Sequence, residues 1–285
     1  MTKVQLSAQE LARMDIFGYL VFPGLLNDRI DRIIEEFEAT FARQGGHHGT
    51  AHDGTARSCI LPFIDQTEYL ASLIDDPRVD GIFTSLLGED YNYLGSDGNF
   101  YVGSTNWHSD TDWSGRMRGK PPRTFYKMAL YLDPVSAVTG ALRVIPGSHR
   151  YGDSFAEDLQ KALQNPQEAL GIGGDQVPAI ALESNPGDVV IFNQSTKHSS
   201  WGGSSRRRMF TINCTAHYAE AEIPLLRNEV AGFARFWPDS LYGEAMMRTA
   251  SPQRLLHMQQ GLSQADHLAA EVIKAKATMK EPSRG

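Results

Sequence analysis

The stretch between residues 89 and 218 constrains the fold of this chain more than any other feature. Short aromatic and β-branched runs alternate there with Gly, Pro, Asn and Asp, which is typical of strands joined by turns. The runs span residues 91–94, 99–102, 124–132, 141–145, 177–182, 189–192 and 209–214. Many short strands at such intervals predict an all-β sandwich or barrel rather than alternating βαβ units.

Helical patterns flank this β region on both sides. Ser7 and Glu10 form a capping-box pattern at the start of a first helix, and a short strand pattern follows at residues 18–22. Apolar residues recur at helical spacing between residues 30 and 41 and again between residues 69 and 87. We predict one domain over residues 1–285, with an N-terminal helical region (1–88), a β core (89–218) and a C-terminal helical extension (219–285).

Composition excludes several classes of function. The chain has 27 Lys+Arg against 34 Asp+Glu, a net charge of −7, and this acidic balance argues against nucleic acid or an anionic membrane as the main partner. No apolar run approaches the roughly 18 residues of a transmembrane helix, and the N-terminus lacks the pattern of a signal peptide. Two cysteines, Cys59 and Cys214, make no disulfide framework. We therefore expect a cytoplasmic protein with a small-molecule substrate.

The segment Asn106-Trp107-His108-Ser109-Asp110 carries the clearest chemical signal. In a strand, His108 and Asp110 are two residues apart and point to the same face. His198 follows the strand run at 189–192, and distant strands of a double-stranded β-helix become neighbours. Together the three residues would form a two-histidine, one-carboxylate triad, which leaves metal positions open and suits non-haem Fe(II). Two alternatives stay open: a hydrolytic or structural zinc protein with the same ligands, and a non-catalytic β-sandwich.

Three further segments carry a family resemblance. They are Phe17-Gly-Tyr-Leu-Val-Phe-Pro-Gly-Leu-Leu26, Thr139-Gly-Ala-Leu-Arg-Val-Ile-Pro-Gly-Ser-His149, and the approach from Gly187-Asp188 to His198. With the His-x-Asp pair, they stand in the order and at the separations typical of one family. The chain resembles the phytanoyl-CoA dioxygenase-like branch of the Fe(II)/2-oxoglutarate-dependent oxygenases over most of its length. The resemblance implies a double-stranded β-helix (jelly-roll, cupin-like) core, with Fe(II), 2-oxoglutarate and O₂. It also implies that His108, Asp110 and His198 are the catalytic iron ligands.

The resemblance also implies where the cosubstrate binds. The family places an arginine about ten positions after the distal histidine, where it pairs with the far carboxylate of 2-oxoglutarate. Arg206, Arg207 and Arg208 lie in that region. We expect Arg208 to bind the cosubstrate, because Arg208, Phe210 and Ile212 would share one strand face, and Arg206 is the second candidate. Ser200 matches a position that often supplies a hydroxyl to the cosubstrate. The family's usual Gly-Ser-Gly-Pro-Asn after the histidine is replaced here by Ser-Ser-Trp-Gly-Gly (199–203).

The implied activity is oxidation of an unactivated C–H bond, with succinate and CO₂ as co-products. Asp110 favours hydroxylation over halogenation, because related halogenases have a small residue at that position. We expect the substrate to be a small polar metabolite or a natural-product intermediate, with an acyl-CoA as the alternative. The flanking helices could pack on the β core or on a second subunit, so a homo-oligomer is left open.

Two loops and one group of tryptophans leave alternatives open. The cations of residues 113–123 could meet an anionic substrate or could be solvated. The cluster of His47, His48 and His52 could bind a metal, although a solvated or lid-like loop is the simpler interpretation. Tryptophans 107, 113 and 201 could wall an aromatic pocket.

Overall fold

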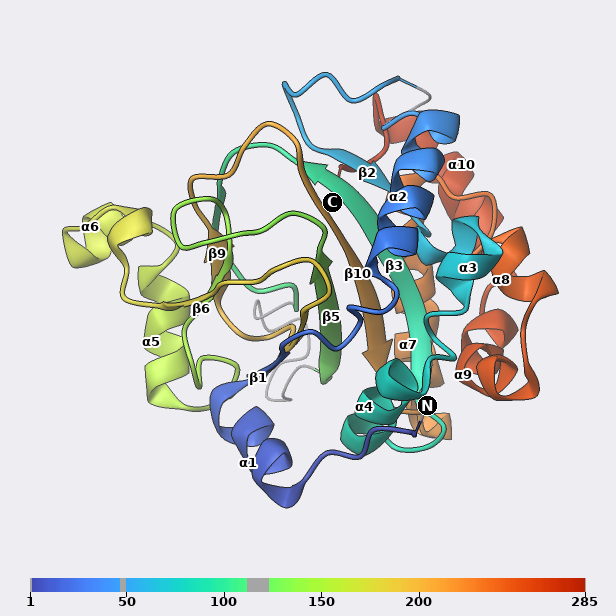
Figure 1. Cartoon of the computed structure of the whole chain (residues 1–285), viewed down its shortest axis with the longest axis horizontal. Coiled ribbons are helices and arrows are strands. Elements are labelled where there is room, and N and C mark those ends of the chain that lie inside the picture. Colours follow the sequence, from blue (N-terminus) through green and yellow to red (C-terminus); the bar gives the residue numbers. More distant parts are fainter. Residues whose placement is uncertain (1, 47–49, 112–122, 285) are drawn as a thin grey trace. The chain divides into compact units, whose positions relative to one another are not determined.

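The computed structural model describes residues 2–46, 50–111 and 123–284 (Figure 1). The chain divides into two compact units. The jelly-roll unit comprises Ser7–Asp28 and Tyr101–Met209, and the helical unit comprises Met1–Leu6, Arg29–Phe100 and Phe210–Gly285.

The jelly-roll unit contains strands of two antiparallel sheets. In one, the order is β1 (Tyr19–Phe22), β8 (Val189–Asn193) and β5 (Phe125–Tyr131). The other has the order β4 (Thr105–His108), β9 (His198–Ser200), β6 (Leu142–Val144) and β7 (Ile180–Leu182). Strands that are distant in sequence therefore lie side by side, as the sequence pattern predicts.

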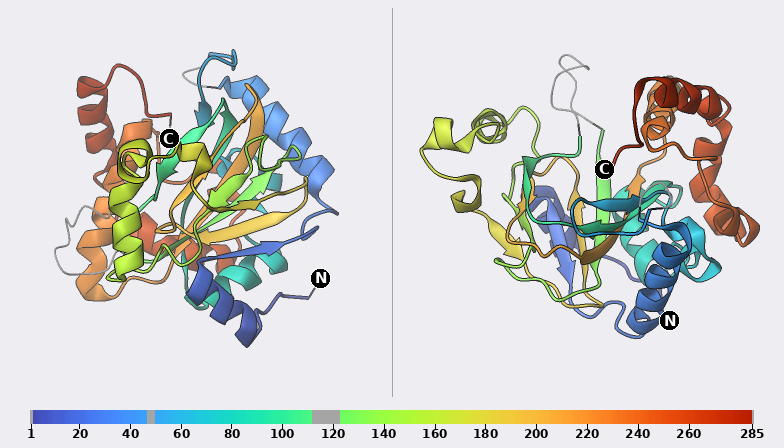
Figure 2. Two further views of the ribbon diagram at one scale, coloured as in Figure 1. Left: turned by 90° about the vertical axis from the view of Figure 1, so that its left-hand side faces the viewer. Right: turned by 90° about the horizontal axis from the view of Figure 1, so that it is seen from above.

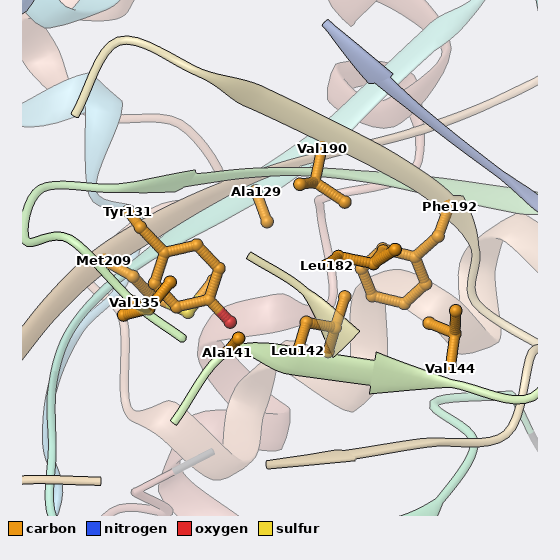
Figure 3. Packing of buried hydrophobic residues seen from close by; sticks show 10 residues of the cluster. All are labelled: Ala129, Tyr131, Val135, Ala141, Leu142, Val144, Leu182, Val190, Phe192 and Met209. Carbon is orange, nitrogen blue, oxygen red and sulfur yellow. The ribbon is translucent and has the colours of Figure 1, made fainter. Parts of the chain in front are cut away.

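A hydrophobic core lies between these strands (Figure 3). Ala129 and Tyr131 of β5 point toward Leu142 and Val144 of β6, because alternate residues of a strand face the same side. Val144 is fully buried. Burial of one such aliphatic side chain stabilises the fold by about 1.5–3 kcal/mol. The remaining members of the cluster are Val135, Ala141, Leu182, Val190, Phe192 and Met209.

Helices complete the jelly-roll unit. They are α1 (Ala8–Phe17), α5 (Ser154–Ala162), α6 (Pro166–Leu170) and the 3₁₀ turn η2 (Gly174–Gln176). The predicted capping box is confirmed, since the Ser7 hydroxyl accepts from the Glu10 amide and the Glu10 carboxylate accepts from the Ser7 amide. The sequence pattern did not predict α5 and α6, which Figure 2 shows in yellow-green on the outside of the unit.

The helical unit contains most helices of the chain. Its helices are α2 (Ile30–Gln44), α3 (Glu68–Ala71), α4 (Pro77–Leu87), α7 (Ile223–Gly232), α8 (Glu244–Arg248), α9 (Pro252–Ser263) and α10 (Leu268–Thr278), with 3₁₀ turns η1 (Ile64–Gln66), η3 (Glu220–Glu222) and η4 (Phe233–Phe236). Strand β2 (Ser58–Ile60) pairs antiparallel with β3 (Asn92–Tyr101), and β10 (Arg207–Thr215) is the other neighbour of β3. The division between the units falls inside β3 and β10.

Two helical-unit elements differ from the predicted pattern. The continuous helix expected at residues 69–87 is interrupted, because Asp76 caps the start of α4 and Pro77 takes the first helical position, where its missing N–H is harmless. The runs at 91–94 and 99–102 are parts of one strand, β3. None of the helices in the described residues is long and apolar enough to cross a membrane.

Candidate metal centre

Antiparallel pairing of β4 and β9 brings the two predicted histidines together. His108 ends β4 and His198 begins β9, and the two are register partners. Their ring centroids are 4.2 Å apart. The pairing thus joins residues that are 90 positions apart in the chain, which the sequence alone could only suggest.

Asp110 completes the group. Its Oδ1 lies 3.7 Å from His108 Nε2, and its Oδ2 lies 3.7 Å from His198 Nε2. One ligand atom from each of the three residues falls within 4.8 Å of the others. The amide of Asp110 donates to the Gln194 carbonyl at 2.9 Å, which holds the backbone after β4 in place.

Backbone carbonyls orient both imidazole rings. His108 Nδ1 lies 2.8 Å from the Asn106 carbonyl, and His198 Nδ1 lies 2.9 Å from the Thr196 carbonyl. A carbonyl can only accept, so each Nδ1 carries a proton, and Nε2 is the ring nitrogen left to bind a metal when the imidazole is neutral. Such bonds to the second nitrogen are typical of metal-binding histidines.

The protonation states also suit a cation. Burial lowers the pKa of His198 to about 4, so this imidazole is neutral at pH 7. Burial alone would raise the pKa of Asp110, but the Lys127 ammonium beside it holds that pKa well below its usual range. A divalent metal needs neutral imidazoles and an ionised carboxylate, and His198 and Asp110 fit that requirement.

The two histidines differ in exposure. The side chain of His198 is 6% exposed, whereas that of His108 is 40% exposed. The Phe192 ring packs edge-on against His198, with centroids 5.0 Å apart. The group is therefore closed on the His198 side and open on the His108 side.

Lys127 is a site residue that sequence reasoning missed. Its Nζ lies 2.7 Å from Asp110 Oδ2. Strand alternation could have identified it, because Lys127 shares a face of β5 with Ala129 and Tyr131, which belong to the hydrophobic core. A lysine on the core-facing side of a strand is unusual and indicates a specific partner.

Arg207 is the arginine that the structure brings to Ser200. It is 3% exposed, and its Nη2 donates to the Ser200 hydroxyl at 3.2 Å. Its guanidinium carbon lies 5.3 Å from the centroid of the Tyr101 ring. A Cβ at Gly140 or Gly203 would overlap the guanidinium, so both glycines make room for it. Arg207 Nε is buried without a hydrogen-bond partner among the described residues.

Arg208 and Arg206 have different surroundings from those expected. Arg208 Nε and its amide donate to the Asp133 carboxylate at 3.0 and 2.8 Å. Arg206 is exposed, and its amide donates to the Ser204 hydroxyl. Strand alternation is the reason, because neighbouring residues of β10 point to opposite faces. Of the three arginines, Arg207 is the one whose guanidinium lies beside Ser200.

The tryptophans form a separate cluster. Trp107 Nε1 donates to the Gly174 carbonyl at 2.7 Å, and its ring packs with Ile145 and Leu163. Trp201 packs against the same cluster. Trp107 precedes His108 in β4, so its side chain points to the opposite face of that strand.

Two predicted loops are only partly described. Trp113 and most of the cationic segment lie outside the described residues, as do His47 and His48. His52 stacks on Phe100, with centroids 4.8 Å apart, and its Nδ1 lies 2.8 Å from the Ser58 hydroxyl. These contacts give His52 a packing role.

The chain is similar in sequence and in structure to several known proteins. Ectoine dioxygenase of Sphingopyxis alaskensis is 27% identical over 152 residues, which cover 48% of this chain and 50% of that protein. The chain thus matches about half the length of that relative. The structure of EctD from S. alaskensis with 2-oxoglutarate and 5-hydroxyectoine has a TM-score of 0.55 at 22% identity, covering 76% of this chain and 78% of that one. The non-heme alpha ketoglutarate dependent carbocyclase SnoK from nogalamycin biosynthesis has a TM-score of 0.57 at 21% identity, covering 76% and 86%.

These matches bear on the sequence predictions. The structural likeness confirms the double-stranded β-helix fold. EctD has also been solved with bound Fe, so the relatives hold the predicted metal and cosubstrate. The family model for phytanoyl-CoA dioxygenase (PhyH) matches residues 14–210, well over half of the sequence. The chain belongs to the phytanoyl-CoA dioxygenase family.

Proposed function

We propose that this chain is an Fe(II)/2-oxoglutarate-dependent dioxygenase whose metal ligands are His108, Asp110 and His198. The observation that carries the proposal is the convergence of their three ligand atoms within 4.8 Å. Two imidazoles and one carboxylate form the donor set that suits non-haem Fe(II) and leaves other positions open.

The chain and the bound groups have separate tasks in this proposal. Bound iron, with 2-oxoglutarate and O₂, supplies the oxidation, which yields succinate and CO₂ as co-products. His108, Asp110 and the buried His198 would hold the metal, and the exposed edge of His108 would leave access for the substrate. The chain positions the target C–H bond.

Arg207 is proposed to bind the distal carboxylate of 2-oxoglutarate, with the Ser200 hydroxyl beside it. Its burial supports this role, because a buried guanidinium with an unpartnered Nε is ready to accept an anion. A planar guanidinium grips a carboxylate with two parallel hydrogen bonds. Arg208 is less suited, since its guanidinium already pairs with Asp133.

The proposed substrate is a small polar metabolite or a natural-product intermediate, and the proposed reaction is hydroxylation or another oxidation of a C–H bond. Relatives that are an ectoine dioxygenase and a carbocyclase of nogalamycin biosynthesis support this class. An acyl-CoA is the alternative substrate within the same family. The single-domain organisation, a cytoplasmic location and a homo-oligomeric state stay predictions.

An anaerobic titration tests the metal assignment. Fe(II) and 2-oxoglutarate added to the wild-type protein should give a visible charge-transfer band, which shifts when a true substrate from a metabolite panel binds. Asp110→Ala should lose both the band and succinate formation. The matched control is Asp158→Ala, at an exposed site on α5, which should keep both.

Two results would contradict the proposal. Near-normal succinate formation by Asp110→Ala would refute the triad. Zinc binding without any decarboxylation of 2-oxoglutarate in air would favour a hydrolytic or structural metalloprotein instead.

A further inference from the structure

Lys127 stands next to the triad on the inner side of the jelly-roll unit. It shares a face of β5 with Ala129 and Tyr131, whose side chains point toward β6 in Figure 3. Its side chain is 19% exposed, and that of Asp110 is 21% exposed. The cation is thus partly shielded from solvent, beside a carboxylate that we assign to the metal.

The contact between them involves one oxygen of the carboxylate. Lys127 Nζ lies 2.7 Å from Asp110 Oδ2, at the short end of the range for charge-assisted hydrogen bonds. Asp110 Oδ1 lies 3.7 Å from His108 Nε2, and Oδ2 lies 3.7 Å from His198 Nε2. Because Oδ2 already accepts a hydrogen bond from the ammonium, Oδ1 is the oxygen whose lone pairs are more available to a metal.

The number of oxygens that Asp110 offers decides how many metal positions stay open. A carboxylate can bind a metal with one oxygen or with two. In an octahedral site, two histidines and a one-oxygen carboxylate leave three positions, whereas a two-oxygen carboxylate leaves two. Chelation by 2-oxoglutarate and access of a further small ligand together need three.

We propose that Lys127 is a positioning residue that keeps Asp110 a one-oxygen metal ligand. The proposal rests on the proposed function, because it needs the metal at His108, Asp110 and His198. It adds a trade-off, since an ammonium beside the site repels a divalent cation and lowers metal affinity. Lys127 weakens metal binding and preserves the third open position.

Mn(II) is the probe for the test, because it suits oxygen and nitrogen ligands and its bound waters relax the bulk water protons. Affinity is measured from the free Mn(II) signal in electron paramagnetic resonance, and the number of bound waters from proton relaxivity. Lys127→Met should bind Mn(II) at least about tenfold more tightly, because both the repulsion and the competing hydrogen bond are gone. Its relaxivity should fall by about a third, from three bound waters to two.

The controls separate this role from general damage to the fold. Lys127→Arg keeps the charge and the donors and should behave like the wild type. Lys161→Met makes the same change at an exposed lysine of α5 and should also behave like the wild type. Lys127→Leu is the second neutral variant if Lys127→Met does not fold, as judged by circular dichroism.

The outcomes are distinguishable. Unchanged relaxivity or weaker Mn(II) binding in a folded neutral variant would overturn the role of Lys127 and leave the proposed function standing. A wild-type protein that binds no Mn(II) would overturn both.

Discussion

Arg207 and Arg208 are adjacent in sequence, yet one is buried beside Ser200 and the other pairs with Asp133. Sequence reasoning could predict that one of three consecutive arginines faces the cosubstrate. It could not predict which one, because a shift of one residue in a strand exchanges the two faces. Lys127 was missed for a related reason. Its partner Asp110 follows β4, whereas Lys127 lies in β5, and the sequence does not show which side chains of the two segments meet. The three candidate metal ligands could be predicted from the sequence, because their spacing and order are informative even when the strand register is unknown. They are His108, Asp110 and His198.

The difference between the two arginines predicts the effect of replacing each. Arg207→Met should weaken 2-oxoglutarate binding to the Mn(II)-loaded protein by about 3 kcal/mol, roughly a hundredfold, because two charge-assisted hydrogen bonds are lost. Arg208→Met, the matched control, should change it less than about threefold. Isothermal titration calorimetry measures both values. A large loss in Arg208→Met with little change in Arg207→Met would reverse the assignment.

At the scale of elements, strands with apolar or β-branched runs were predictable, and strands without such a run were not. β5 and β8 carry long apolar runs, so their patterns are clear. β9 has the sequence His-Ser-Ser, which carries no strand signal, and it forms because β4 and β6 pair with its two edges. Its existence depends on tertiary pairing, which propensity cannot reveal.

The helices α5 and α6 were missed for another reason. α5 contributes Leu159 to the cluster around Trp107 rather than to the core between the sheets, and α6 has no buried residue. Trp107 is 8% exposed in this cluster, whereas the neighbouring His108 side chain is 40% exposed, so we expect the Trp107 ring to act in packing rather than in the wall of a substrate pocket.

This placement predicts the behaviour of a Trp107 variant. Trp107→Phe should lower the free energy of unfolding by about 1–2 kcal/mol, because the bond to the Gly174 carbonyl and part of the ring contact are lost. Mn(II) affinity should stay within about twofold of the wild type. Urea unfolding gives the first value and Mn(II) titration the second. A folded variant with strongly impaired metal binding would place the ring in the site instead.

At the scale of the whole molecule, the residues proposed for the metal and the cosubstrate all belong to the jelly-roll unit. In the helical unit, the buried carboxyl group of Asp65 makes the free energy of unfolding depend on pH. Asp65 is 1% exposed, and its oxygens accept from the Tyr93 hydroxyl at 2.6 Å and the Gly243 amide at 2.9 Å. Burial raises the pKa of Asp65 to about 6 against these favourable contacts. The folded state therefore favours the protonated carboxyl.

The sign of the pH effect follows from the raised pKa. The stability linked to protonated Asp65 is fully present below pH 3.8 and is lost as the pH rises through about 6. The shift of about two pH units corresponds to about 3 kcal/mol. Asp65→Asn removes this dependence, because its amide can donate to the Tyr93 hydroxyl while its oxygen accepts from Gly243. Relative to the wild type, this variant should gain stability between pH 4.5 and pH 7.5.

Urea unfolding at several pH values measures that difference. Asp76→Asn is the control, because hydrogen bonds from Arg78 and Arg29 lower the pKa of Asp76 to about 2 despite its burial. Its difference from the wild type should be constant above pH 5. A pH-independent difference for Asp65→Asn would contradict the assignment.

The unequal exposure of the two histidines has a consequence for metal loss. A chelating agent would reach a bound ion from the His108 side, where the side chain is 40% exposed. His108 would therefore be the first protein ligand to be displaced. His198, which is enclosed beside Phe192, would be the last to dissociate from the ion. Demetallation would then proceed stepwise, with a partly stripped ion still attached to the buried imidazole.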